Sequence, residues 1–224
     1  MDKYLWIVNK QKHYNKEAAE KFNYVPYQDE DGESFLEEKT YAAYNELAEY
    51  LKQTYGIVLE VISAGRSLET QQSVYDHFLA KRGQEWTENH VALPGTSEHH
   101  TGLALDVNPH GLKPKMVQKL IDKTPALKRY FDKQERESGK LDEMYHTLHN
   151  VLPYYGFILR YTDDKKPITG YNGERWHIRF VGKELAKEIT DSGLCLEEFV
   201  KKLEQQKPAG GGSGMGEESG GPSM

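Results

Sequence analysis

The segment from Ser97 to Asp106 combines side chains that could bind a metal ion. It reads Ser-Glu-His-His-Thr-Gly-Leu-Ala-Leu-Asp, so His99 and Asp106 lie seven positions apart, on either side of Gly102. The alternating pattern after Gly102 predicts a strand with Asp106 on one face and the leucines on the other. Because seven is odd, His99 and Asp106 would face opposite ways on one straight strand. If both bind one ion, we expect the chain to bend at Gly102.

A second segment, residues 172–181, lies about seventy positions further on and has a similar form. A glycine precedes Glu174, and His177 follows in an alternating run that predicts a strand. Two imidazoles and one carboxylate are a usual ligand set for catalytic zinc, whose fourth position stays open for water, and a glutamate that is not a ligand can act as the base. A lone His-Asp pair is more often an ordinary hydrogen bond. The two segments together favour a metal site.

The two motifs, Ser-x-His-x-x-Gly-x-Ala-x-Asp and Glu-x-Trp-His, resemble the signature pair of the zinc D,D- and L,D-carboxypeptidases of bacterial cell-wall metabolism. This family includes the vancomycin-resistance carboxypeptidases and dipeptidases and the LD-carboxypeptidase B group. Other segments resemble family segments in the same order, and the resemblance spans roughly residues 57 to 185. These segments are residues 63–67 with Gln71, residues 92–95, and residues 155–161 with 168–170.

The resemblance implies a fold and a ligand set. The fold would be a single α+β domain of the LAS and hedgehog-like type, with helices packed around a small central antiparallel sheet that carries the zinc site. One Zn²⁺ per chain would be held by His99, Asp106 and His177. Glu174 would take a proton from the attacking water and return it to the departing amine. Arg66 would stabilise the oxyanion on the attacked carbonyl.

The resemblance also implies a substrate-binding wall. Arg66 would pair with polar or anionic substrate groups through its planar fork of donors. Gln71, on the next helical turn, and Ser97 would contact the substrate as well. On sequence alone, a turn or capping role for the Ser97 hydroxyl is equally consistent.

One position departs from the family pattern. Relatives carry proline between the glutamate and the tryptophan of the second motif, where this chain has Arg175. Proline would restrain the backbone beside Glu174. A nearby positive charge is expected to lower the pKa of Glu174.

By resemblance, the expected activity is removal of C-terminal D-alanine from peptidoglycan stem peptides or precursors. A D-Ala-D-Ala dipeptidase of the same family would use the same residues. A zinc-stabilised binding domain without catalysis is a third possibility, although the presence of Glu174 argues against it. An endolysin peptidase would need a wall-binding module, for which the chain has no room. A penicillin-binding serine carboxypeptidase is excluded because the chain has no Ser-x-x-Lys.

Composition limits the other possibilities. The 224 residues, 37% hydrophobic with a net charge of -6, predict one soluble domain and no nucleic-acid partner.

We divide the chain into an extended lead-in (1–34), the carboxypeptidase domain (35–207) and a flexible Gly/Ser-rich tail (208–224) that we take to be foreign to the protein. We expect a monomer without a transmembrane segment. It would be cytoplasmic if Met1 is native, and at the cell surface if a signal or anchor was trimmed.

Periodicity and turn signals predict the remaining elements. Polar and turn-rich stretches predict a loop over 82–96 and a turn over 108–111. Helices are expected at 35–55, 68–81, 144–152, 183–190 and 196–205, and strands at 4–8, 57–62, 102–107, 157–161 and 176–181.

Overall fold

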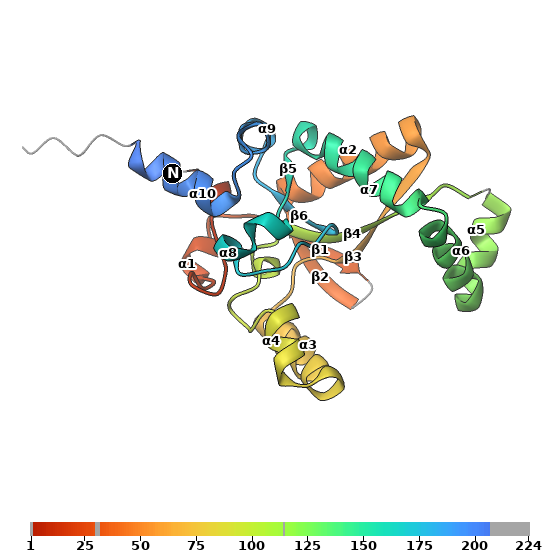
Figure 1. The fold of residues 1–224 in the computed structure, drawn as a ribbon, viewed down its shortest axis with the longest axis horizontal. Helices are drawn as coiled ribbons and strands as arrows, with labels where there is room; N and C mark the ends of the chain where they lie inside the picture. The colour runs from red at the N-terminus through yellow and green to blue at the C-terminus, as the bar shows by residue number, and fades with distance from the viewer. Residues whose placement is uncertain (1, 30–31, 114, 207–224) are drawn as a thin grey trace, which may run out of the picture.

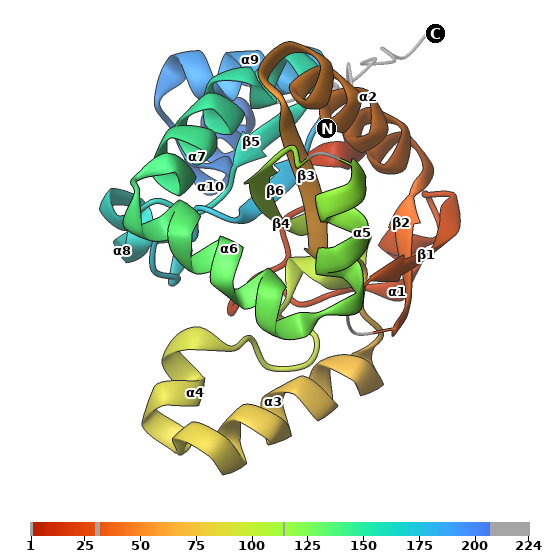
Figure 2. The ribbon, with the colours of Figure 1, turned by 90° about the vertical axis from the view of Figure 1, so that its right-hand side faces the viewer.

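Four antiparallel strands form the sheet at the centre of the computed structural model, which describes residues 2–29, 32–113 and 115–206. The strands lie in the order β3-β4-β6-β5. Their bounds are β3 (Ile57–Ser63), β4 (Ala104–Gly111), β6 (His177–Phe180) and β5 (Phe157–Leu159). Helices surround this sheet in both views (Figures 1 and 2), so the fold is the expected single α+β domain.

The apolar face of the sheet packs against two helices, α2 (Glu38–Tyr55) and α7 (Lys140–Val151). Leu105 and Val107 of β4 are fully buried in this core together with Leu47 and Leu148 of the helices. The alternation along β4 therefore divides the strand as expected, with the leucines in the core and Asp106 on the opposite, partly exposed face.

A second core joins the two ends of the described chain. Leu5 packs with Val181, Leu196 and Phe199 beneath helices α9 (Lys183–Ser192) and α10 (Leu196–Gln205). The prediction of a strand over 4–8 is wrong, since a 3-10 helix, η1 (Lys3–Leu5), lies there.

The segment before α2 also contains a hairpin of β1 (Tyr24–Asp29) and β2 (Gly32–Glu37). The expected boundary between residues 34 and 35 falls inside β2, and residues 208–224 lie outside the described residues.

The other elements are α1 (Lys16–Ala19), α3 (Leu68–Arg82), α4 (Gln84–His90), η2 (Glu98–Thr101), α5 (Lys115–Lys123), α6 (Pro125–Glu137), η3 (Leu152–Tyr155), η4 (Asp163–Lys165) and α8 (Lys166–Thr169). None of the helices in the described part of the chain is both long and apolar enough to cross a membrane.

Two predictions for connecting segments are wrong. The expected loop over 82–96 contains helix α4, which forms with α3 a hairpin that projects from the body of the molecule (Figure 2). The expected turn over 108–111 instead continues β4, because these residues pair with β3 as far as the Ile57–Gly111 pair.

The expected bend between His99 and Asp106 is confirmed at Gly102. This residue has a φ of +63° and ends the 3-10 helix η2, immediately before β4. An added Cβ would lie 2.9 Å from the backbone nitrogen of Glu37, which donates a hydrogen bond to the Gly102 carbonyl. Both the left-handed backbone and the close approach of the β2 end require glycine here.

We expect Gly102→Ala to destabilise the protein by more than the ~1–2 kcal/mol that a left-handed alanine alone costs. Urea denaturation measures the change. Gly193→Ala is the matched control, because Gly193 has a φ of +65° but no atom within 4 Å of an added Cβ. Equal losses in the two variants would contradict the role of the close approach to β2.

Candidate metal centre and cleft

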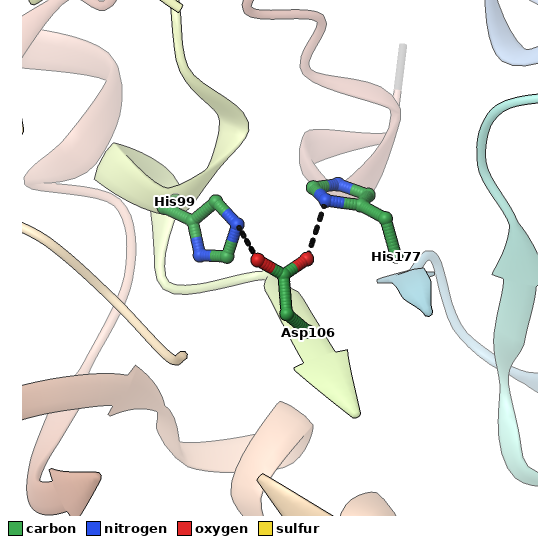
Figure 3. Close-up of side chains that lie close together, drawn as sticks. All are labelled: His99, Asp106 and His177. Carbon is green, nitrogen blue, oxygen red and sulfur yellow. Dashed lines mark hydrogen bonds and ion pairs between the residues drawn. The ribbon is translucent and has the colours of Figure 1, made fainter. Parts of the chain in front are cut away.

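The antiparallel pairing of β4 with β6 sets Asp106 directly opposite His177. Side chains in such a pair start from Cβ atoms about 5 Å apart. Nδ1 of His177 lies 3.0 Å from one carboxylate oxygen of Asp106, and Nε2 of His99 lies 3.3 Å from the other. Figure 3 shows the carboxylate between the two imidazoles. The three candidate ligand atoms all lie within 4.8 Å of one another, so the structure brings the expected ligand set together.

The outer ring nitrogens of both histidines face acceptors. Nδ1 of His99 donates to the carbonyl of Ala64 at 2.5 Å, and Nε2 of His177 lies 3.5 Å from the Glu98 carboxylate. Metal-binding histidines are held in this way, because an acceptor on one nitrogen orients the other toward the ion. The donor set and its supports therefore fit a zinc ion with an open coordination position.

Glu98 is a functional residue that the sequence analysis missed. It is 2% exposed, and its Oε1 accepts hydrogen bonds from Arg160 and Arg179, each at 2.8 Å. Burial raises the pKa of Glu98, but the two guanidinium groups outweigh this effect and hold the pKa well below its usual range. An anionic acceptor therefore stands behind His177. In the sequence, its position between Ser97 and His99 was the only feature that could have pointed to Glu98.

Glu174 lies at the edge of the same site. Its Oε2 is 3.8 Å from Nδ1 of His177, and its backbone N–H donates to the Tyr161 carbonyl at 3.1 Å. Burial raises the pKa of Glu174, with a further contribution from Asp106 that His177 and Arg66 partly oppose. A carboxylate at the edge of a metal site can accept a proton and return it during a reaction.

The pKa of Glu174 is raised, and Arg175 turns toward helix α7. The guanidinium group pairs with Asp142 and lies 4.6 Å from the centre of the Tyr145 ring, both on α7. Burial of the Glu174 carboxyl group is the largest influence on its pKa and raises it.

Arg66 follows β3 and enters the site beside Asp106. Its Nη2 lies 3.8 Å from Oδ2 of Asp106, and its backbone N–H donates to the His99 carbonyl at 3.2 Å. The Nδ1–H of His100 donates to the Arg66 carbonyl at 2.8 Å, so both sides of this peptide segment are anchored. Within the described residues, the buried Nε of Arg66 has no hydrogen-bond partner.

The candidate ligands, Glu174 and Arg66 line a cavity of about 180 Å³. Gln71 and Ser97 also lie in its wall. Nε2 of Gln71 donates to the Ala92 carbonyl, while its buried Oε1 has no partner within the described residues. Ser97 Oγ accepts a hydrogen bond from the His99 N–H, so the hydroxyl caps η2 at the rim of the cavity. The rest of the wall is largely apolar or aromatic and includes Val74, Phe78, Tyr161, Tyr171 and Trp176.

Comparisons with known proteins identify a family and several relatives. A family model described as VanY, D-alanyl-D-alanine carboxypeptidase, matches residues 33–183. YodJ of Bacillus subtilis (strain 168), an inferred carboxypeptidase, is 32% identical over 201 residues, which cover 85% of this chain and 67% of YodJ. VanXYC of Enterococcus gallinarum, a bifunctional D-Ala-D-Ala dipeptidase and D-Ala-D-Ala carboxypeptidase, is 36% identical over 147 residues, or 66% of this chain and 68% of VanXYC.

A solved structure shows the same architecture. It is the D,D-pentapeptidase VanY of a VanB-type vancomycin-resistance cassette, crystallised as a glutamate-to-alanine mutant in complex with Zn(II). It superposes with a TM-score of 0.67 at 28% identity and covers 89% of this chain and 99% of that chain.

We expect Glu98→Ala to weaken zinc binding by about 10–100-fold, because His177 loses its orienting carboxylate. It should also cost about 3–5 kcal/mol of stability, because two buried arginines lose their shared counter-charge. Competition with a chromophoric chelator measures zinc affinity, and urea denaturation measures stability.

Glu197→Ala is the control for Glu98→Ala, since Glu197 also pairs with Arg160 but is not a partner of His177. This variant should keep wild-type zinc affinity. If Glu98→Ala does not fold, Glu98→Gln replaces it with a neutral side chain of the same size. Wild-type zinc affinity in the Glu98 variant would refute the orienting role.

Proposed function

The chain belongs to the VanY family of D-alanyl-D-alanine carboxypeptidases, and on this premise we propose that it is a zinc-dependent enzyme that releases C-terminal D-alanine from peptidoglycan stem peptides or their precursors. The observation that carries this proposal is the convergence of the set His99, Asp106 and His177 with Glu174 and Arg66 in one cleft.

His99, Asp106 and His177 hold the metal in this proposal. When bound there, zinc lowers the pKa of a water molecule toward about 7 and polarises a carbonyl group. The protein contributes the orientation of the ligands, because the Ala64 carbonyl faces the outer nitrogen of His99 and the Glu98 carboxylate faces that of His177.

Glu174 is the general base and then the general acid. Its carboxylate accepts a proton as the water oxygen attacks the carbonyl carbon of the scissile peptide bond. It returns the proton to the amide nitrogen as the carbon–nitrogen bond breaks, which gives a new carboxylate and free D-alanine. A positioned carboxylate can carry out both proton transfers.

Arg66 is the electrophilic partner. Arg66 lines the cavity, and its Nη2 lies 3.8 Å from Oδ2 of Asp106, where a guanidinium group can donate to the oxygen that becomes negative during attack. Loss of such a donor typically costs on the order of 3 kcal/mol of barrier. Gln71 and Ser97, which both line the cavity, bind the substrate in this proposal.

A dipeptidase acting on free D-Ala-D-Ala is the second candidate. The relative VanXYC has both activities. The same ligands and the same base would serve this reaction, so only the length of the substrate separates the two functions.

The decisive experiment measures release of D-alanine by zinc-loaded protein from a muramyl pentapeptide, a tetrapeptide and D-Ala-D-Ala in separate reactions. We expect release from the pentapeptide. Cleavage of the tetrapeptide alone would indicate an L,D-carboxypeptidase, and cleavage of the dipeptide alone would indicate the second candidate. If no substrate is cut while one equivalent of zinc is bound, the enzymatic proposal fails and a zinc-stabilised binding domain takes its place.

Glu174→Ala is the companion variant. We expect it to lower kcat by at least about 100-fold, because the proton transfer loses its positioned base. Zinc stoichiometry should stay at that of the unmodified protein, since Glu174 is not in the ligand set. A variant that lost zinc together with activity would show that Glu174 supports the metal site instead.

A further inference from the structure

The backbone that carries Glu174 forms a tight turn. The His177 N–H donates to the Glu174 carbonyl at 3.1 Å, which closes a four-residue turn with Arg175 at its second position. Proline is favoured at this position of a turn because its ring presets φ near the required value. Arginine provides no such restraint, so the orientation of Glu174 depends on other contacts.

Helix α7 supplies contacts to both the side chain and the backbone of Arg175. The guanidinium group pairs with Asp142 and lies over the Tyr145 ring, with 4.6 Å between the guanidinium carbon and the ring centre. The Nε2–H of His149 donates to the Arg175 carbonyl at 2.9 Å. We call these three contacts the Arg175 clamp. They come from one face of α7, because their partners are spaced three and four residues apart.

Tyr145 also joins the clamp to the strand that carries a metal ligand. Its hydroxyl donates to the Val107 carbonyl at 3.0 Å, and the Val107 N–H donates to the Trp176 carbonyl at 3.0 Å. Tyr145 itself is buried. The turn is therefore held on one side by β4, next to Asp106, and on the other by α7.

We propose that Arg175 is a positioning residue that clamps the turn of residues 174–177 onto α7 and so aims the Glu174 carboxylate into the cleft. This inference rests on the proposed role of Glu174 as the base. Arg175 does not touch the reacting atoms in this proposal. Its contribution is to restrict the turn through Asp142, Tyr145 and His149.

The test compares Arg175→Ala, Asp142→Ala and the double variant with the wild-type enzyme. Lys183→Ala is the matched control, because Lys183 is also an exposed cation with a carboxylate partner, Glu46 at 3.1 Å, and an aromatic ring, Tyr155, beneath it. The measurements are kcat and KM for D-alanine release, zinc affinity, and amide hydrogen exchange of the peptide covering residues 172–178.

We expect Arg175→Ala to lower kcat about fivefold, since an exposed ion pair and a cation–π contact together have this order of effect. KM and zinc affinity should stay within about twofold, and exchange in residues 172–178 should become faster. Asp142→Ala should show a smaller loss, and the double variant should be no slower than Arg175→Ala, because both changes remove the same clamp. Lys183→Ala should match the wild type.

Two outcomes would overturn the inference. One is unchanged hydrogen exchange in residues 172–178 of Arg175→Ala. The other is an equal loss of kcat in Lys183→Ala, which would indicate a general effect of surface charge. Hydrogen exchange needs no substrate, so it tests the Arg175 clamp even if the wild-type protein cleaves none of the peptides. Failure of the proposed function and failure of the clamp are therefore distinguishable.

Discussion

The pairing of β4 with β6 is the constraint on which the rest of the site depends. It sets Asp106 opposite His177 on one face of the sheet and, in the same register, Leu105 opposite Ile178 on the other. Both of these apolar residues are fully buried. A slip of one residue would expose them and turn the carboxylate into the core. The hydrophobic effect on one face of the sheet therefore fixes the geometry of the candidate metal ligands on the other.

A buried cluster of charges connects this register to the ends of the described chain. Glu98 accepts from Arg160 and Arg179, and Arg179 also donates to the carbonyls of Tyr4 and Trp6. Arg160 also donates hydrogen bonds to the Glu197 carboxylate on α10. Buried charges are tolerated only when they are paired and hydrogen-bonded, so this network requires the N-terminal segment and α10 to be in place. The N-terminal segment and the last helix thus help to satisfy the buried charges around Glu98.

Much of the central architecture could be predicted from local patterns. Alternation identified β4 and β6, a run of apolar residues identified β3, and helical periodicity identified α2 and α7, whose apolar residues pack in the core. The short elements could not be found in this way. The prediction of a turn over 108–111 was wrong because β4 continues through Pro109, paired with β3. At Pro109, β6 no longer lies beside β4, so the missing N–H of proline leaves no hydrogen bond of the sheet unmade.

Residue types and spacing by themselves favoured a metal site that involves His99, Asp106 and His177, and they predicted the bend at Gly102 and the separation of polar and apolar strand faces. These features follow from the chemistry of the side chains and from the two-residue repeat of a strand. Only the tertiary structure decided that Glu98 stands behind His177 and that Arg175 turns toward α7. Glu98 is 81 positions from Arg179, and Arg175 is 33 positions from Asp142. Contacts between residues so far apart have no local periodicity, so they exist only once the sheet and helices have packed.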